Sequence, residues 1–162
     1  MSEAFERVAA TLDYPMFVVT TVADGERSGC LVGFATQCSI HPPRFLACLS
    51  VKNHTYRVAQ RAAMLAVHVL HDADKHTAEV FGAETGDEVD KFGEVAWHTG
   101  PENLPILDAA KAWFAGPILE VVDLGDHHGF LLDPTHGDVG DAQPDDIFTF
   151  QEARDIKAGH PA

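Results

Sequence analysis

The sequence lacks the features that mark secreted and membrane-spanning chains. Its cysteines are an odd set of three, spread through apolar segments at positions 30, 38 and 48, which argues against a disulfide framework and for a reducing compartment. No apolar run approaches the roughly 20 residues of a membrane-spanning helix. The N-terminus, MSEAFERVAA, has neither a basic cluster nor the apolar core of a signal peptide. We therefore expect a cytoplasmic protein that does not act on membranes.

Positive charge is also scarce, because 11 Lys and Arg residues stand against 25 Asp and Glu residues, for a net charge of −14. This balance disfavours nucleic acids and anionic surfaces as partners. The exception is an acid-free stretch over residues 27–71, which has no Asp or Glu and is rich in small and hydrogen-bonding residues. Its charged side chains are Arg27, Arg44, Lys52, Arg57 and Arg61. A small molecule that carries a phosphate is the natural ligand for this stretch.

Short apolar and β-branched segments dominate the chain and predict its fold. Strands are expected at 16–22, 28–36, 44–51, 64–70, 113–124, 130–132 and 147–150. Ser2 and Asn53 are expected to cap short helices. A GxGxxG motif and alternating βαβ units are absent, which argues against a Rossmann domain. The pattern favours a mostly β, antiparallel barrel in a single domain over residues 1–162, with a core at about 5–150 and a loose tail at 151–162.

Residues 29–43 form the first segment suited to a flat ligand. Small residues there let a ligand approach the backbone N–H groups, and Thr36, Gln37 and Ser39 add side-chain hydrogen bonds. The alternative is an ordinary glycine-containing edge strand that ends in a proline turn. Composition by itself does not separate the two interpretations.

Residues 50–57 form the second segment, where a strand ends and a helix begins. A helix N-terminus offers unpaired N–H groups and partial positive charge, both of which favour phosphate. Ser50, Asn53 and Thr55 add polar groups, and Lys52 and Arg57 add charge. An ordinary Asn-capped surface helix is the alternative.

A tight turn with the sequence Gly125-Asp126-His127 is the third segment, and it places an imidazole between two strands. Taken alone the tripeptide is a weak signal, and an exposed turn histidine is the more common case. The order of these elements, however, resembles the flavin reductase-like, FMN-binding split-barrel family over about residues 5–132. The tracts that carry the resemblance are Asp13-Tyr14-Pro15, Val18-Val19-Thr20-Thr21, Asp24-Gly25, Gly29, Ser39-Ile40-His41-Pro42-Pro43, Asn53-His54-Thr55-Tyr56 and Gly125-Asp126-His127.

The resemblance implies an antiparallel split β-barrel (FMN-binding type) with a few short helices. It implies a homodimer with FMN near the interface, with FAD or riboflavin as alternative flavins and NADH or NADPH as the reductant. It assigns His127 to the nicotinamide pocket as the candidate catalytic residue. The residues that it assigns to the flavin are Phe34, Ala35, Thr36, Gln37, Cys38, Ser39, Ser50, Lys52, Asn53, His54, Thr55, Arg57, Phe81, Lys91 and Phe92.

The chain departs from the family pattern in the flavin segment. Most relatives have Thr, Asn or Ser where this chain has Leu31, Gly33 and Phe34, so a more apolar ring environment is expected. Beyond the loop, Leu132-Asp133-Pro134 interrupts the strand that follows in many relatives. We expect flavin binding to survive these changes more readily than nicotinamide specificity.

The expected activity is hydride transfer from NAD(P)H to flavin, chemistry that the two cofactors perform while the protein orients them. Two alternatives stay open at this point: a flavin carrier or electron-transfer module without turnover, and a reductase that supplies flavin to a separate oxygenase. His68, His71 and His76 lie close in sequence, but the cysteines lack ligand spacing, so no functional metal is expected. Cys38 has no obvious partner acid or base, which favours a packing role over catalysis.

Overall fold

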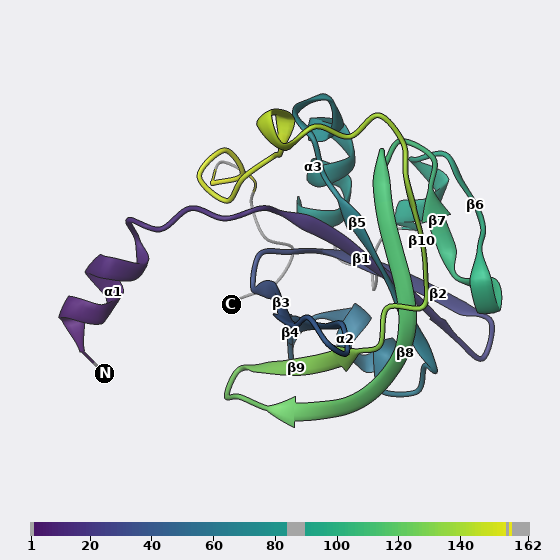
Figure 1. The fold of residues 1–162 in the computed structure, drawn as a ribbon, viewed down its shortest axis with the longest axis horizontal. Coiled ribbons are helices and arrows are strands. Elements are labelled where there is room, and N and C mark those ends of the chain that lie inside the picture. Colours follow the sequence, from purple (N-terminus) through teal and green to yellow (C-terminus); the bar gives the residue numbers. More distant parts are fainter. Residues whose placement is uncertain (1, 84–89, 155, 157–162) are drawn as a thin grey trace.

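The structure is a computed structural model that describes residues 2–83, 90–154 and 156. A curled antiparallel sheet forms its body, with helices at the margins (Figure 1). The α-helices are α1 (Glu3–Ala9), α2 (His54–Ala59) and α3 (Lys75–Ala83). The strands are β1 (Phe17–Ala23), β2 (Glu26–Val32), β3 (Ala35–Ser39), β4 (Arg44–Ser50), β5 (Met64–Val69), β6 (Trp97–Thr99), β7 (Pro105–Leu107), β8 (Ala112–Asp123), β9 (His127–Leu132) and β10 (His136–Val139). Short 3-10 turns are η1 (Asp72–Asp74), η2 (Lys91–Gly93), η3 (Pro101–Asn103) and η4 (Pro144–Asp146).

The main sheet runs in the order β2-β1-β5-β8-β9-β4-β3, and β10 adds to β8. β8 pairs with β5 along its first half and with β9 along its second, with a register shift between Ile118 and Glu120. Since the long strand passes from one group of partners to the other at this irregularity, the sheet curls on itself. All neighbouring strands are antiparallel, as the sequence predicts.

Both faces of β1 are buried, and they supply two separate hydrophobic clusters. Phe17 and Val19 point into the curl of the sheet, where they pack with residues of β4 and β9. Met16 and Val18 point to the other side, where they pack with Phe81 of α3. Because successive side chains of a strand face opposite ways, one short strand anchors both clusters.

Local signals place several elements correctly. Asp24 and Gly25 have φ values of 53° and 79° and form the predicted two-residue hairpin turn between β1 and β2. The Ser2 side chain accepts from Phe5 N, so it caps α1 as expected. The Asn53 side chain caps α2 in the same way. Among the helices that the described residues form, none is both long and apolar enough to cross a membrane.

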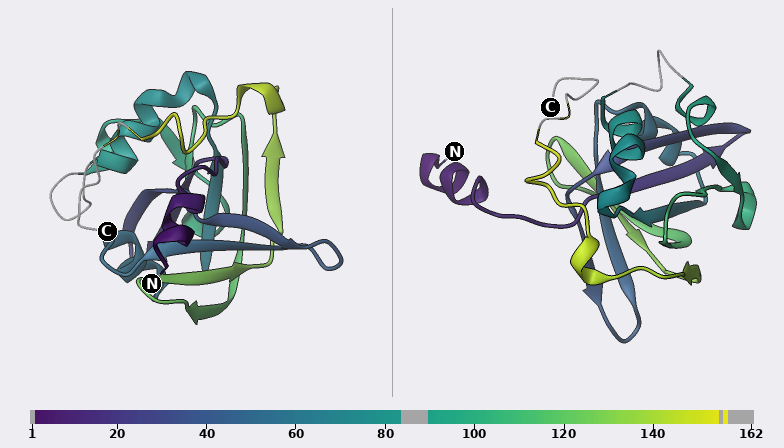
Figure 2. Two further views of the ribbon diagram at one scale, coloured as in Figure 1. Left: turned by 90° about the vertical axis from the view of Figure 1, so that its left-hand side faces the viewer. Right: turned by 90° about the horizontal axis from the view of Figure 1, so that it is seen from above.

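α1 stands away from the body on an extended connector, and no residue of the helix is buried (Figures 1 and 2). Phe5 and Val8 of α1 and Leu12, just beyond its end, form what we call the apolar stripe, with exposed fractions of 64%, 58% and 53%. Figure 2 also shows the turn between β3 and β4 projecting from the body.

The second half of the chain differs from the sequence expectation. β8 is continuous across Gly116 and Pro117, two residues that ordinarily disfavour a strand interior. A Cβ on Gly116 would clash with the backbone of Asp133, so glycine permits this close approach. The tight turn expected at Gly125-Asp126-His127 ends earlier, since β9 already begins at His127.

Two other elements also differ from the expectation. β10 was not predicted, although it pairs in register with β8. The strand expected at 147–150 makes only isolated bridges, between Ile147 and His71 and between Thr149 and Pro15. Both features depend on contacts with distant parts of the chain, which local sequence patterns do not reveal.

The acid-free stretch is not an isolated positive surface once the chain is folded. Arg44 forms an ion pair of 3.0 Å with Asp133. Arg61 pairs with Asp24 at 2.7 Å and with Glu26 at 2.8 Å. Acids from outside the stretch therefore neutralise part of its charge, which the sequence order by itself does not show.

Candidate functional site

A pocket of about 380 Å³ opens beside β2 and β4, a size typical of small-molecule sites. Residues 30–34 and 48–50 supply one side, which we call the strand wall. Tyr14, Phe150, Ala153, Arg154 and Ile156, from the two ends of the chain, supply what we call the terminal wall.

The strand wall is set by the geometry of β4 and the end of β2. The backbone N–H of Cys48 donates to Phe34 O at 2.8 Å, which holds the segment after β2 against β4. Along β4, Leu49 is buried in the core while Cys48 is half-buried and lines the pocket. A Cβ on Gly33 would lie 2.9 Å from the Tyr14 ring, so glycine lets the two walls meet closely.

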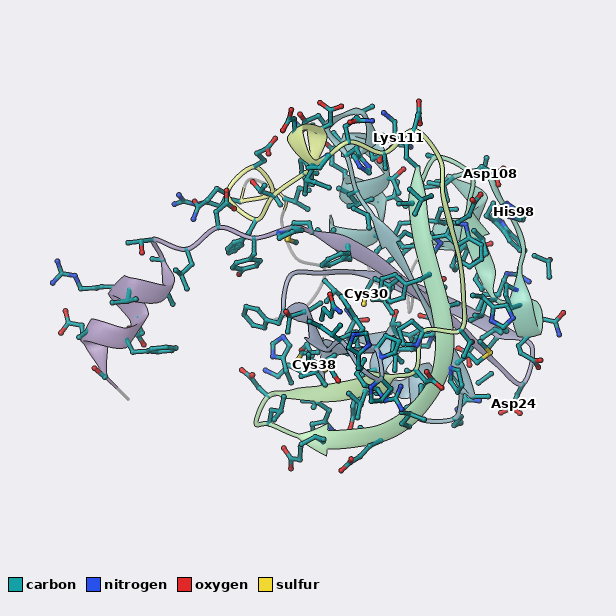
Figure 3. The ribbon with its side chains drawn as sticks, viewed as in Figure 1. Asp24, Cys30, Cys38, His98, Asp108 and Lys111 are labelled. Carbon is teal, nitrogen blue, oxygen red and sulfur yellow. The ribbon has the colours of Figure 1, made fainter. Side chains whose placement is uncertain are left out.

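Two cysteine thiols belong to the strand wall. Burial raises the pKa of the Cys30 thiol to about 11, and it also raises the pKa of the Cys48 thiol. Both therefore stay protonated at neutral pH and offer the pocket small apolar surfaces. Figure 3 shows Cys30 within the curled sheet, and Cys38 lies on β3 with an exposed side chain.

Aromatic rings run in a row from the terminal wall to the strand wall. The rings of Phe150 and Tyr14 stack with centroids 4.8 Å apart and planes 19° apart. Tyr14 lies 6.3 Å from Phe34, and Phe34 lies 5.0 Å from the ring of His127. Phe34 is 55% exposed although it lines the pocket, so one face of this row is open to a ligand.

A buried ammonium lies at the base of the pocket. Lys91 is 5% exposed, and its Nζ donates to the carbonyl oxygens of Gly29 and Phe81 at 3.2 Å each. Burial of a charged group is costly unless it is hydrogen-bonded, and these carbonyls supply such bonds. The pocket thus contains a fixed positive charge beneath an otherwise apolar wall.

Polar side chains occupy the end of the pocket near α2. The hydroxyl of Ser50 accepts from Lys52 N at 3.3 Å, at the end of β4. Asn53 Oδ1 accepts from Thr55 N at 2.8 Å and caps α2. Ser50 and Asn53 both line the pocket, whereas Lys52 does not.

The loop before β9 carries the histidine that the sequence singles out. Ser50 and His127 are partners in the β4–β9 ladder, which brings the histidine to the polar end of the pocket. His127 Nδ1 lies 2.8 Å from Asp126 Oδ1. This hydrogen bond holds the pKa of the Asp126 carboxyl below its ordinary value.

The structure therefore brings part of the predicted set together. The predicted residues that line the pocket are Phe34, Ser50, Asn53, Phe81, Lys91 and His127. The remaining predicted residues do not line it: Ala35, Thr36, Gln37, Cys38, Ser39, Lys52, His54, Thr55, Arg57 and Phe92. For all of these residues, contact with a flavin stays a prediction.

The residues outside the pocket have identifiable positions. Ala35 to Ser39 belong to β3, an edge strand that leads away along β4. His54 Nε2 bonds Glu26 at 2.8 Å, and Thr55 is buried with its hydroxyl 2.8 Å from that of Ser28. α2 packs on the β1–β2 hairpin, and these contacts of His54 and Thr55 are made with β2 of that hairpin.

Two further predicted residues also have partners elsewhere. An Arg57 nitrogen lies 3.3 Å from His54 Nδ1 on the outer side of α2. Phe92 packs edge-on against Phe81, with ring centroids 5.5 Å apart, behind the pocket. Among the described residues, no three His, Cys, Asp or Glu side chains come together as metal ligands.

Sequence reasoning missed the terminal wall. Tyr14 was noted only within a tract that carries the family resemblance, and residues 151–162 were expected to be a loose tail. In the structure Gln151 N donates to Asp13 Oδ1, and Gln151 Nε2 donates to Leu12 O, so the two ends of the chain are joined. These contacts join residues more than 130 positions apart, so no local sequence pattern predicts them. Beyond Arg154, only residue 156 of the predicted tail is described.

The lining fits a ligand with a flat apolar ring and a polar, anionic end. The strand wall and the aromatic row match the ring, and the Lys91 ammonium and the Arg154 guanidinium supply positive charge. Ser50 and Asn53 add hydrogen-bonding groups. FMN has these properties, so the residues present are compatible with the cofactor that the resemblance implies.

The model of the flavin reductase like domain matches residues 9–157. The chain belongs to the flavin reductase-like family. The membership predicted from the sequence is thereby confirmed, and the flavin reductase-like chain has the antiparallel half-barrel predicted for it.

Two curated relatives and one solved structure illustrate the similarity. The probable flavin reductase of Rhizobium meliloti (strain 1021) is 29% identical over 113 residues, 67% of this chain and 35% of the relative. The reductase subunit HsaB of a flavin-dependent monooxygenase from Rhodococcus jostii (strain RHA1) is 31% identical over 114 residues, 68% of this chain and 55% of the relative. The chain thus spans about a third and about half of these proteins.

The solved structure is the NADH:FAD oxidoreductase SgcE6 of Streptomyces globisporus C-1027. It superposes with a TM-score of 0.81 at 26% identity, over 90% of this chain and 86% of that one. The antiparallel half-barrel therefore shares its fold with this oxidoreductase, which confirms the predicted fold class.

Proposed function

We propose that this protein is a flavin reductase that binds FMN in the pocket and uses NADH or NADPH as the reductant. One observation carries the proposal: a single pocket of about 380 Å³ contains an apolar wall, a buried ammonium and the histidine loop expected of the family. The names of the relatives, which include flavin reductases and an NADH:FAD oxidoreductase, support the same activity.

Hydride transfer between a nicotinamide and a flavin is chemistry that the two cofactors supply when they are bound. The protein has to bind and orient them. The strand wall and Phe34 offer apolar surface to the ring, and Lys91 supplies a fixed positive charge beside it. His127 lies at the pocket rim next to the open face of Phe34, where it can position the reductant.

The polar end of the pocket favours FMN over riboflavin, which lacks the phosphate. Ser50 and Asn53 offer hydrogen bonds there. A charge-assisted hydrogen bond contributes about 1.5–3 kcal/mol, or roughly 10- to 150-fold in affinity. Equal affinities for FMN and riboflavin would contradict this assignment of the phosphate end.

An anaerobic titration of the FMN-loaded protein tests the activity. We expect NADH or NADPH to bleach the visible flavin absorption when the protein is present in catalytic amounts. If flavin binds but neither nucleotide reduces it, the protein is a carrier or electron-transfer module. If no flavin binds, the proposal fails.

An oxygenase is the proposed recipient of the reduced flavin. HsaB is named as the reductase subunit of a flavin-dependent monooxygenase, and other relatives are named as reductase components of 4-hydroxyphenylacetate 3-monooxygenase. We infer that this chain also works beside a separate oxygenase. Faster product formation by a flavin-dependent oxygenase when this protein and NAD(P)H are added would support the inference. No acceleration in spite of rapid flavin reduction would contradict it.

We further propose that the chain forms a homodimer, with the apolar stripe of α1 seated on the second copy. None of the described residues covers the stripe, and the turn between β8 and β9, which carries the 56% exposed Leu124, lies on the same side of the molecule (Figure 1). Two copies related by a two-fold axis would cover both surfaces at once. Flavin would then lie near this interface.

Sedimentation of the wild type and of a variant with Phe5, Val8 and Leu12 all changed to Ser tests the dimer. We expect a dimer for the wild type and a shift toward monomer for the variant. Arg7→Ala, on the polar side of α1, is the matched control and should leave the dimer intact. A monomeric wild type, or an equally tight dimer of the triple variant, would contradict the proposal.

Domain organisation and location complete the proposal. We infer that residues 1–162 form one domain, which is supported by a family match that spans residues 9–157. All three cysteines are free thiols, which supports a reducing, cytoplasmic setting.

A further inference from the structure

Two adjacent histidines at the start of β9 differ in how many of their ring nitrogens are engaged. His128 uses both, since Nδ1 lies 2.8 Å from the Tyr56 hydroxyl and Nε2 lies 3.4 Å from Asp123 Oδ1. His127 uses one, because Nδ1 bonds Asp126 Oδ1 at 2.8 Å. Among the described residues, no group is hydrogen-bonded to Nε2 of His127, whose ring lines the pocket.

The bond between Asp126 and His127 also fixes where the imidazole proton resides. An ionised carboxylate only accepts hydrogen bonds, so Nδ1 of His127 must be the donor. In the neutral ring the other nitrogen then carries a lone pair. Nε2 is therefore an acceptor, and the pocket presents it to a ligand group that has an N–H to donate.

The loop is built so that the carboxylate stays beside the ring. Asp126 O accepts from Val51 N at 3.0 Å, which ties the loop to the end of β4. Leu124 N donates to His127 O at 3.2 Å, and Gly125, with φ of +131°, makes the turn that an ordinary residue would resist. The geometry around Asp126 is thus held by the backbone on both sides.

We propose that Asp126 is a positioning residue that fixes His127 as its Nδ1–H tautomer and so presents Nε2 as an acceptor in the pocket. The matching ligand group is an amide N–H, and the carboxamide of a nicotinamide supplies one. This ligand assignment rests on the proposed function. The tautomer assignment stands on the contacts of the loop and does not need a cofactor.

Nitrogen-15 NMR of histidine-labelled, flavin-free protein tests the tautomer directly. We expect the wild type to show Nδ1 protonated and Nε2 unprotonated for neutral His127. Asp126→Ala removes the acceptor and should shift His127 toward the Nε2–H form. Asp126→Asn keeps a carbonyl acceptor without the charge and should retain Nδ1–H. Tyr56→Phe, which removes a partner of His128, is the control and should alter His128 alone.

Kinetics then test the ligand contact. We expect Asp126→Ala to raise the KM for the nicotinamide about two- to tenfold, with kcat and FMN affinity little changed, because one neutral hydrogen bond is lost. Asp126→Asn should restore most of this loss. If Asp126 had only a structural role, its loss would weaken FMN binding as well as raise the KM for the nicotinamide.

The results that would overturn the inference are distinct from those that would overturn the proposed function. Nε2–H in the wild type, or an unchanged tautomer in Asp126→Ala, contradicts the role of Asp126 whatever the activity. An unchanged KM in a variant whose tautomer has shifted contradicts the ligand contact. Absence of NAD(P)H oxidation by the wild type contradicts the function but leaves the tautomer result valid.

Discussion

The two walls of the pocket are built in different ways. Residues of the strand wall are also residues of the barrel core, since Val32 and Leu49 are 4% and 1% exposed. The terminal wall lies outside the barrel: it combines one aromatic stack, hydrogen bonds between the two ends of the chain and packing of Tyr14, Phe150 and Ala153 in the second hydrophobic cluster, and its Arg154 is exposed. The strand wall is therefore part of the barrel core, whereas the terminal wall is assembled beside the barrel from the two ends of the chain.

This difference implies that substitutions should separate stability from binding. Changes in the strand wall remove core contacts and should lower the free energy of unfolding. Changes in the terminal wall remove groups that face a ligand and should alter affinity in a protein that remains folded. The following predictions test that separation, beginning with the largest effect.

Leu49→Ala should cause the largest loss of stability. Leu49 packs in the main core with Phe130 and Leu132, and truncation of a buried leucine typically lowers the free energy of unfolding by about 2–5 kcal/mol. Denaturation in urea measures the change. A loss below about 1 kcal/mol would show that the strand wall is not part of the stabilising core.

Acid should weaken the strands that support this wall. His68 of β5 is fully buried, its Nδ1 donates to Val18 O at 3.0 Å, and its Nε2 accepts from Leu107 N at 3.1 Å. Burial lowers its pKa from 6.5 to about 4, so between these values the unfolded state binds the extra proton. The contribution of His68 to the free energy of unfolding should therefore be complete above pH 6.5 and should decrease toward pH 4, by at most about 3 kcal/mol.

His68→Leu provides the comparison for the acid effect. Leucine does not titrate, so the variant should be less stable overall but show a shallower loss between pH 6.5 and pH 4. Urea unfolding at several pH values gives the slope of the unfolding free energy against pH for the wild type and for the variant. Identical slopes for the wild type and the variant would mean that His68 does not contribute to acid sensitivity.

Arg154→Ala should have the smallest effect and act on binding alone. The side chain is exposed, and screened contacts of this kind contribute little, so we expect FMN affinity to fall about two- to fivefold with unchanged stability. Riboflavin affinity should change less, because riboflavin carries no phosphate for the guanidinium to attract. Arg7→Ala on α1 removes an equal charge away from the pocket and serves as the control. An equal loss for FMN and riboflavin would place Arg154 at the ring instead.

Features of the fold that depend on local sequence were predictable, whereas features that depend on contacts between distant parts of the chain were not. Short-range chemistry was sufficient for the Asp24-Gly25 turn and for the Ser2 and Asn53 caps. The continuous course of β8 past Gly116 was not predictable, because it depends on the approach of Asp133 from a later part of the chain.

The site divides in the same way. Phe34 and His127 were found through the order of family motifs, and both line the pocket. Tyr14 and Phe150 were not found, because their stacking joins residues at opposite ends of the sequence. The family resemblance therefore predicted part of the strand wall and the histidine loop, and none of the terminal wall.

The central claim is that flavin binds between these two walls, and a blocked pocket tests it most directly. Cys48 is half-buried on the pocket side of β4, so Cys48→Trp should fill the space. Val139→Trp, at a 73% exposed position on β10, is the control. In a fluorescence titration we predict that FMN binds the wild type and Val139→Trp equally and binds folded Cys48→Trp about tenfold or more weakly. Equal binding to all three proteins, or no binding to the wild type, would contradict the account.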